Sequence, residues 1–204
     1  MQIWAIHGGD AFASYEEYLE YLKTRQINLK RLNSWDWKSH LGGVLGARYE
    51  VFMPQMPNKQ NAKYAEWKIW LERFIPYMDE EIILIGHSLG GCFVAKYLAG
   101  TDFPKRIRAT FVVAAPYDEA EHSEFAKHLY DFAPPKNLER LVKQGGKIFL
   151  YQSKDDPVVS FSELAKYQEA LPNAIVRVFE DREHFNQKSF PELVEDIKSL
   201  ETSK

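Results

Sequence analysis

Short apolar runs alternate with amphipathic helical patterns along almost the entire chain, and few folds accommodate that alternation. Several of the runs, such as residues 82–85 and 110–115, are almost continuously apolar. Strands with this composition are buried on both faces, as they are in parallel sheets covered by helices. We therefore expect an α/β fold whose strands are joined by right-handed crossovers.

The apolar runs predict six strands, at residues 2–7, 49–53, 81–85, 109–114, 147–152 and 175–179. A doubly wound sheet places the first and third of these strands side by side. The expected strand order is therefore 2-1-3-4-5-6. Helices on both faces would make a three-layer α/β/α sandwich around a mostly parallel six-stranded sheet.

The most regular helical patterns are at residues 61–78 and 190–200, where apolar side chains recur at helical spacing. A chain of 204 residues predicts a single domain spanning residues 1–204. Two stretches, 26–48 and 116–146, do not fit a simple strand–helix repeat. We interpret both as insertions above an edge of the sheet.

Composition excludes several other classes of protein. Hydrophobic residues make up 45% of the chain and the net charge is -3, without the basic stripe that nucleic-acid binding requires. The first residues lack a signal-peptide pattern, and no apolar stretch approaches the roughly 20 residues that span a bilayer. Cys92 is the only cysteine, which fits a reducing compartment. We expect a cytoplasmic protein without a nucleic-acid or membrane partner.

The segment Gly86-His87-Ser88-Leu89-Gly90 contains the pattern G-x-S-x-G. The pattern alone arises by chance in roughly one chain in fifteen of this length. Here it directly follows a predicted strand and precedes a helical pattern at 92–98, which is the setting of a nucleophile elbow. The sequence therefore predicts Ser88 as a nucleophile. The alternative is a glycine-rich turn with an incidental serine.

A carboxylate and an imidazole follow later strands. Asp156 comes after the fifth predicted strand, and His184 lies between the sixth strand and the last helix. The chain order Ser88, Asp156, His184 is typical of one of the folds that carry a serine triad. Alternatively, Asp155 and Asp156 only form a turn or a helix cap.

The first predicted strand ends in His7-Gly8-Gly9-Asp10, beside Ser88 in the expected strand order. An oxyanion hole would then combine the Leu89 N–H with one N–H from Gly9 or Asp10. The alternative is a flexible turn, and both interpretations are compatible.

Six residues are candidates for substrate contact. His7 and Asp10 flank the predicted oxyanion loop, and His87 occupies the variable elbow position. Trp35, Trp37 and Tyr117 lie in the two insertions and would wall a pocket for an acyl group, unless they cover the core instead. No metal or cofactor is expected.

The chain resembles the α/β-hydrolases in its HGG, GHSLGG, Asp-Asp-Pro and His-Phe segments, from Ile3 to the last helix. Its small size is similar to that of the lidless group that includes the retinoblastoma-binding serine hydrolase. In that group the second aspartate of Asp-Asp-Pro is the acid and the histidine of Gly-His-Phe is the base. The resemblance implies these roles for Asp156 and His184, although Glu183 replaces the glycine.

These features predict a serine hydrolase that cleaves a small-molecule ester, thioester or amide, most closely resembling a carboxylesterase. A second hypothesis is a protein-binding module that kept the fold with little or no turnover, so a protein partner remains open. A third is a flavodoxin-like nucleotide or phosphate binder, which the absence of P-loop and G-x-G-x-x-G patterns disfavours.

Overall fold

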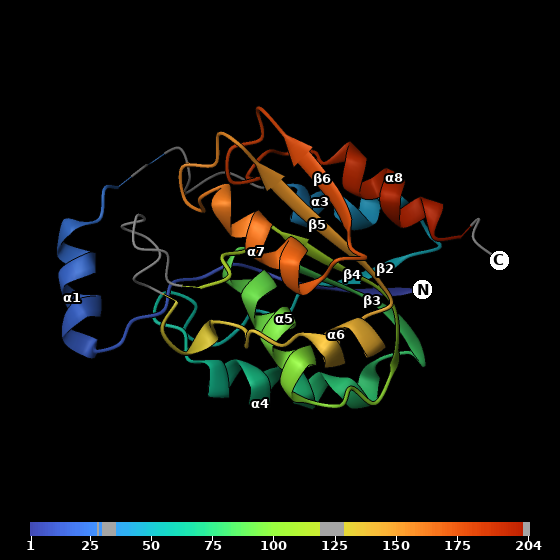
Figure 1. The fold of residues 1–204 in the computed structure, drawn as a ribbon, viewed down its shortest axis with the longest axis horizontal. Helices are drawn as coiled ribbons and strands as arrows, with labels where there is room; N and C mark the ends of the chain where they lie inside the picture. The colour runs from blue at the N-terminus through green and yellow to red at the C-terminus, as the bar shows by residue number, and fades with distance from the viewer. Residues whose placement is uncertain (28, 30–35, 119–128, 202–204) are drawn as a thin grey trace.

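The structure, a computed structural model, describes residues 1–27, 29, 36–118 and 129–201 (Figure 1). Six strands form one sheet in the order β2-β1-β3-β4-β5-β6, and every neighbouring pair is parallel. The expected strand order is confirmed. The strands are β1 Gln2–Ile6, β2 Glu50–Phe52, β3 Glu81–His87, β4 Arg106–Val113, β5 Lys147–Ser153 and β6 Ile175–Phe179.

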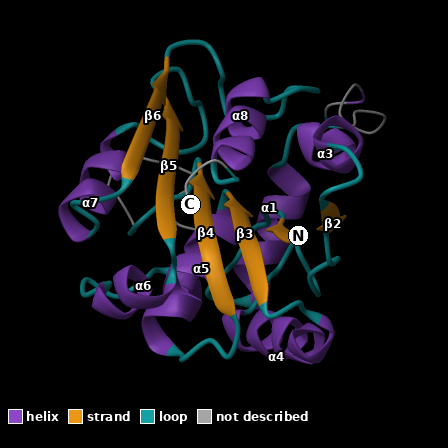
Figure 2. Cartoon of the chain, turned by 90° about the vertical axis from the view of Figure 1, so that its right-hand side faces the viewer, coloured by secondary structure: helices purple, strands orange, loops and turns teal. Residues whose placement is uncertain are grey.

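Helices cover both faces of the sheet, which confirms the three-layer sandwich (Figure 2). The helices are α1 Tyr15–Thr24, α3 Trp37–Leu45, α4 Tyr64–Phe74, α5 Leu89–Gly100, α6 Glu139–Gln144, α7 Ser162–Ala170 and α8 Pro191–Ser199, with short 3-10 turns η1 Ile75–Tyr77 and η3 Tyr130–Phe132. Along β1, Ile3 and Ala5 belong to the core that includes residues of α3 and α8, whereas Trp4 and Ile6 belong to the core that includes residues of α4, α5, α6 and α7. Because each face of the sheet has its own core, β1 is apolar from Ile3 to Ile6.

The expectation of an irregular insertion at 26–48 is wrong for its second half. Helix α3 covers a face of the sheet and packs beside α8. Trp37, Leu41 and Leu45 recur every fourth residue and are buried. Two glycines in the helix masked this pattern, while Asp36 starts the helix by accepting a hydrogen bond from the Lys38 N–H. The assignment of residues 1–204 to one domain stays a prediction.

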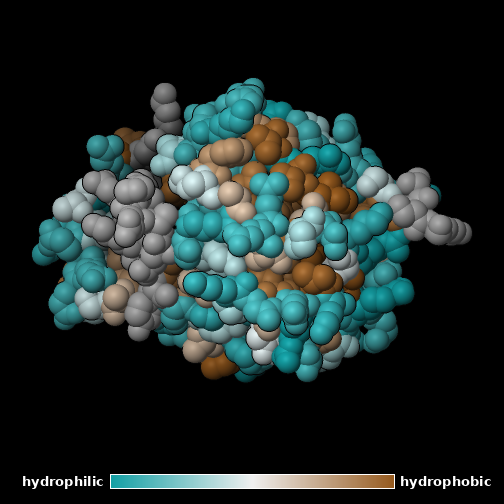
Figure 3. All heavy atoms as spheres, viewed as in Figure 1, coloured by the Kyte–Doolittle hydropathy of each residue, from teal (hydrophilic) through white to brown (hydrophobic). Residues whose placement is uncertain are grey.

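Helix α1 has no buried residues and lies outside the layers, beyond the ends of the strands (Figure 1). The face shown in Figure 3 is hydrophilic over much of its area, with hydrophobic patches. One apolar groove of about 860 Å³ lies between α6 and the residues around Leu171, and Val142 and Ile175 line it. In the described parts of the chain, no helix combines the length and the apolar composition needed to cross a membrane.

Candidate active site

The turn between β3 and α5 holds Ser88 in a strained backbone conformation. Its φ of 56° and ψ of -127° are rare for a residue with a side chain. Two glycines make this turn possible. A Cβ on Gly86 would lie 2.5 Å from the Gly90 carbonyl oxygen, and one on Gly90 would lie 2.4 Å from the Ile6 carbonyl oxygen. The strand, turn and helix therefore approach too closely for larger residues.

Ser88, His184 and Asp156 form a continuous hydrogen-bonded chain at the carboxyl ends of β3, β6 and β5. The Ser88 hydroxyl lies 2.9 Å from His184 Nε2, and His184 Nδ1 lies 2.9 Å from Asp156 Oδ2. With the Nδ1–H donated to the carboxylate, Nε2 is free to accept the serine proton. The structure thus brings together the three residues predicted as a triad.

The Asp156 carboxylate has no exposed side-chain surface, so its charge depends on hydrogen bonds. Oδ1 accepts the backbone N–H groups of Val158 at 2.8 Å and Val159 at 3.0 Å. Oδ2 accepts from the Gln152 side chain at 3.3 Å as well as from His184. These donors fix the carboxylate so that it orients the imidazole.

Asp155 has a different set of partners from its neighbour. Its Oδ1 accepts from the Ser153 hydroxyl at 2.5 Å and from the Glu183 N–H at 2.9 Å. The Ser153 hydrogen bond is the main reason that the pKa of the Asp155 carboxyl is lowered. Asp155 therefore holds the loop that carries His184 but does not contact the imidazole in the structure.

Gly8 brings the first loop against the serine. A Cβ on Gly8 would lie 3.0 Å from Ser88 Cβ and 3.4 Å from Ser88 Oγ. A Cβ on Gly9 would lie 2.4 Å from the Lys59 carbonyl oxygen. Close approach to backbone requires a glycine at position 9, and the tight contact at Gly8 shows that this loop is adjacent to the serine, as its position after the first strand suggested.

The hydrogen bonds of the loop after β1 and of the start of α5 indicate which backbone N–H groups are available to bind an oxyanion. The Asp10 N–H donates to the Lys59 carbonyl oxygen at 2.8 Å, so it is already engaged. This favours Gly9 over Asp10 as the second donor. Leu89 is the first residue of α5, where an N–H has no carbonyl partner within the helix.

The side chain of Asp10 has partners within the protein. The Asp10 carboxylate lies 3.7 Å from Arg25 and 3.4 Å from the Tyr21 hydroxyl.

Both ring nitrogens of His7 contact backbone groups of the protein. Its Nδ1 lies 2.7 Å from the Gly8 carbonyl oxygen, and its Nε2 accepts the Met56 N–H at 2.9 Å. Burial lowers the pKa of His7, which keeps the imidazole in the neutral form that this pair of contacts requires. His7 therefore fixes the loop beside Ser88, and both ring nitrogens are engaged within the protein.

A series of linked polar side chains contacts the backbone of His184. His87 Nε2 lies 2.9 Å from the His184 carbonyl oxygen, and His87 Nδ1 lies 3.3 Å from the Lys38 ammonium. Lys38 in turn pairs with Asp36 at 2.5 Å. Burial, followed by the charge of Lys38, holds the pKa of His87 well below its usual range, so His87 stays neutral and accepts from Lys38.

The start of α3 also holds the rest of the histidine loop. The Trp37 indole N–H donates to the Phe185 carbonyl oxygen at 2.8 Å, and the Trp37 backbone N–H donates to the Gln187 carbonyl oxygen at 2.8 Å. Lys38 was not a predicted site residue. No local pattern marks it, because its partner His87 lies 49 positions away. We interpret Lys38, Trp37 and His87 as positioning residues.

We expect Lys38→Met to lower kcat/KM for ester hydrolysis by about 10-fold to 100-fold, because a small displacement of a catalytic group has effects of this size. The substitution removes the donor that orients His87 and leaves the Asp36 carboxylate without its ion pair. Lys68→Met is the matched control, since Lys68 also pairs with a carboxylate at 2.5 Å, on α4. Equal kinetics for wild type and Lys38→Met would refute the positioning role.

Two of the three aromatic candidates for a pocket wall are core residues. Trp37 is 2% exposed and Tyr117 is 7% exposed, with the Tyr117 ring packed against Tyr167 at 4.9 Å. Both are large apolar surfaces that the protein buries between elements, so the prediction that they wall an acyl pocket is not supported. Trp35 lies outside the described residues.

Comparisons with known proteins identify the family and the fold of the chain. The sequence pattern of the serine hydrolase family matches residues 31–200. Serine hydrolase RBBP9 of Rattus norvegicus is 26% identical over 155 residues, which cover 76% of this chain and 79% of that protein. The chain is also similar in fold to the ydeN gene product of B. subtilis, with a TM-score of 0.71, 16% identity and 99% of both chains covered. A mutant of the meta-cleavage product hydrolase CumD from Pseudomonas fluorescens IP01 has a TM-score of 0.67 at 12% identity, covering 99% of this chain and 90% of that one. The chain therefore belongs to the serine hydrolase family and has the α/β-hydrolase fold.

Proposed function

We propose that this protein hydrolyses a small ester, thioester or amide through an acyl-enzyme on Ser88, with carboxylesterase-like chemistry. The observation that carries the proposal is the unbroken chain from Ser88 Oγ through His184 to the buried Asp156. The strained turn at Ser88 is the second support, since such strain persists where the surrounding structure enforces it.

Each residue then has one role. His184 takes the Ser88 proton as Oγ attacks the carbonyl carbon, and the N–H groups of Leu89 and Gly9 stabilise the oxyanion. Asp156 stabilises the imidazolium, which next protonates the leaving group as the bond to it breaks. Water, deprotonated by His184, attacks the acyl-enzyme and releases the acid and Ser88.

Pre-steady-state hydrolysis of p-nitrophenyl acetate tests this proposal. We expect a burst of p-nitrophenol of up to one equivalent per protein, because attack on an activated ester outpaces deacylation. Ser88→Ala should show no burst. A parallel series of acetyl ester, thioester and anilide ranks the three substrate classes, and we expect the ester to have the highest kcat/KM. A linear time course with all three substrates, no faster than that of Ser88→Ala, would contradict the proposal.

The second candidate function is a protein-binding module with little or no turnover. The apolar groove beside Val142 and Ile175 favours it, because such surfaces often mark interaction sites. A folded protein that shows no burst and no steady-state hydrolysis would favour this candidate.

We also propose a cytoplasmic location, which is consistent with the single cysteine, Cys92, being a buried free thiol.

A further inference from the structure

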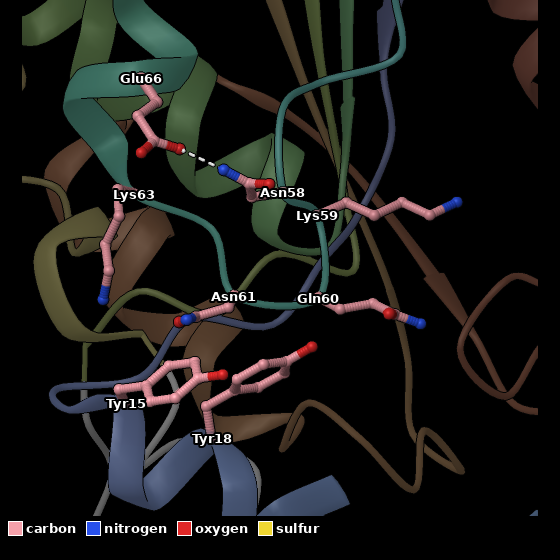
Figure 4. A pocket seen from close by; sticks show the side chains of 8 residues that line it. All are labelled: Tyr15, Tyr18, Asn58, Lys59, Gln60, Asn61, Lys63 and Glu66. Atoms are coloured by element: carbon pink, nitrogen blue, oxygen red, sulfur yellow. Dashed lines mark hydrogen bonds between the residues drawn. The ribbon is translucent and has the colours of Figure 1, made fainter.

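A cleft of about 550 Å³ separates α1 from the loop at residues 58–63. Figure 4 shows the rings of Tyr15 and Tyr18 on the α1 side of this cleft and the side chains of Gln60 and Asn61 on the loop side. Tyr15 is 62% exposed, and its ring lies 6.0 Å from that of Tyr18. The exposed ring of Tyr15 and the half-buried ring of Tyr18 therefore face a wall that carries amide and charged side chains.

The loop wall of this cleft is joined directly to the loop beside Ser88. Asp10 donates its N–H to the Lys59 carbonyl oxygen at 2.8 Å and accepts the Ala62 N–H at 2.8 Å. Gly9 lies so close to the Lys59 carbonyl oxygen that a Cβ would clash with it, and the next residue back, Gly8, contacts Ser88. Lys59, which lines the cleft, thus packs directly against the loop that contacts Ser88.

The lining of the cleft restricts the chemistry of an occupant. Among the described residues, its side chains are tyrosines, amides and charged groups, without an aliphatic residue. The amide of Asn58 is held by Glu66 at 3.1 Å. Gln60 and Asn61 line the same wall, and a side-chain amide both donates and accepts hydrogen bonds. A hydroxyl group also does both and therefore matches this wall, whereas an alkyl chain does neither and a simple anion only accepts.

We propose that the cleft binds a hydroxyl-rich group, such as a sugar, that forms part of the substrate ester. The carbon–hydrogen face of such a ring packs on Tyr15 and Tyr18, and its hydroxyl groups form hydrogen bonds with the side-chain amides of the loop wall. The proposal rests on the hydrolase function proposed above and specifies its substrate class.

Two pairs of esters test the proposal and identify which side of the ester occupies the cleft. Glucose 6-acetate against ethyl acetate varies only the alcohol, and methyl gluconate against methyl hexanoate varies only the acyl group. We expect at least one pair to favour the polyol ester by about 10-fold in kcat/KM, the effect of one or two good contacts. Equal values within both pairs, or a preference for the alkyl ester, would overturn the proposal.

Variants of two cleft residues test whether the preference for polyol esters arises in the cleft. Tyr15→Ala and Asn61→Leu should each lower kcat/KM for the preferred polyol ester by about 5-fold to 10-fold and leave the matched alkyl ester unchanged. Tyr77→Ala is the control, because Tyr77 is 77% exposed and does not line the cleft. A polyol preference that both cleft variants retain would exclude this site. If wild type hydrolyses neither member of any pair and gives no burst, the hydrolase function itself fails.

Discussion

Replacing Asp156 by asparagine should lower kcat for ester hydrolysis by about 10⁴-fold, as loss of the acid does in other serine triads. Asparagine keeps the shape of the side chain, but its amide cannot stabilise the imidazolium and favours the wrong imidazole tautomer. The loss should appear in kcat, because the acid acts on the transition state and does not contact substrate. Steady-state kinetics with p-nitrophenyl acetate measure it.

Asp155→Asn is the matched control, since Asp155 is the adjacent aspartate in the same loop. Asparagine keeps an acceptor for the Glu183 N–H, and residue 155 does not contact His184, so we expect an activity loss of at most about 10-fold. A large loss in Asp155→Asn with a small loss in Asp156→Asn would show that the acid is assigned to the wrong residue. Thermal unfolding of both variants separates loss of chemistry from loss of fold.

Replacing Gly86 by alanine should lower the free energy of unfolding by about 3 kcal/mol or more, because the added methyl group meets backbone atoms. The nearest are the Gly90 carbonyl oxygen at 2.5 Å and Gly91 Cα at 2.6 Å. Urea unfolding measures the change. Gly43→Ala is the control: nothing lies within 4 Å of its Cβ position, and it lies within α3. We expect Gly43→Ala to stabilise the protein by about 0.5–1 kcal/mol. If the urea midpoint of Gly86→Ala equals that of the wild type, the turn is looser than its geometry indicates.

Local sequence patterns were sufficient for much of the fold. The continuous apolar runs in β1, β3 and β4 predicted burial on both faces, and the structure has helices on both faces. The strand order followed from the general rule for doubly wound sheets. Helix α3 escaped detection because Gly42 and Gly43 interrupt a helix whose buried residues, Trp37 among them, gave only a short pattern.

The positions of Ser88, Asp156 and His184 were also predictable, since each follows a recognisable strand. The residues that hold His184 were not, because contacts such as Lys38–His87 join distant parts of the chain.

The backbone conformation at Glu183 could not be predicted from the sequence comparison alone. The resemblance implied a glycine at this position, and the structure shows Glu183 at a φ of 44°, where glycine is favoured. Glu183 therefore holds this backbone conformation at the cost of local strain.

Labelling with a fluorophosphonate probe tests the role of Ser88 most directly, because the probe forms a covalent bond only with an activated serine. We expect stoichiometric labelling of the wild-type protein, with the mass increase located on the peptide that contains Ser88. Ser88→Ala should not be labelled, and Asp156→Asn should be labelled far more slowly. Equal labelling of wild type and Ser88→Ala, or no labelling of a folded wild-type protein, would contradict the assignment of Ser88 as the nucleophile.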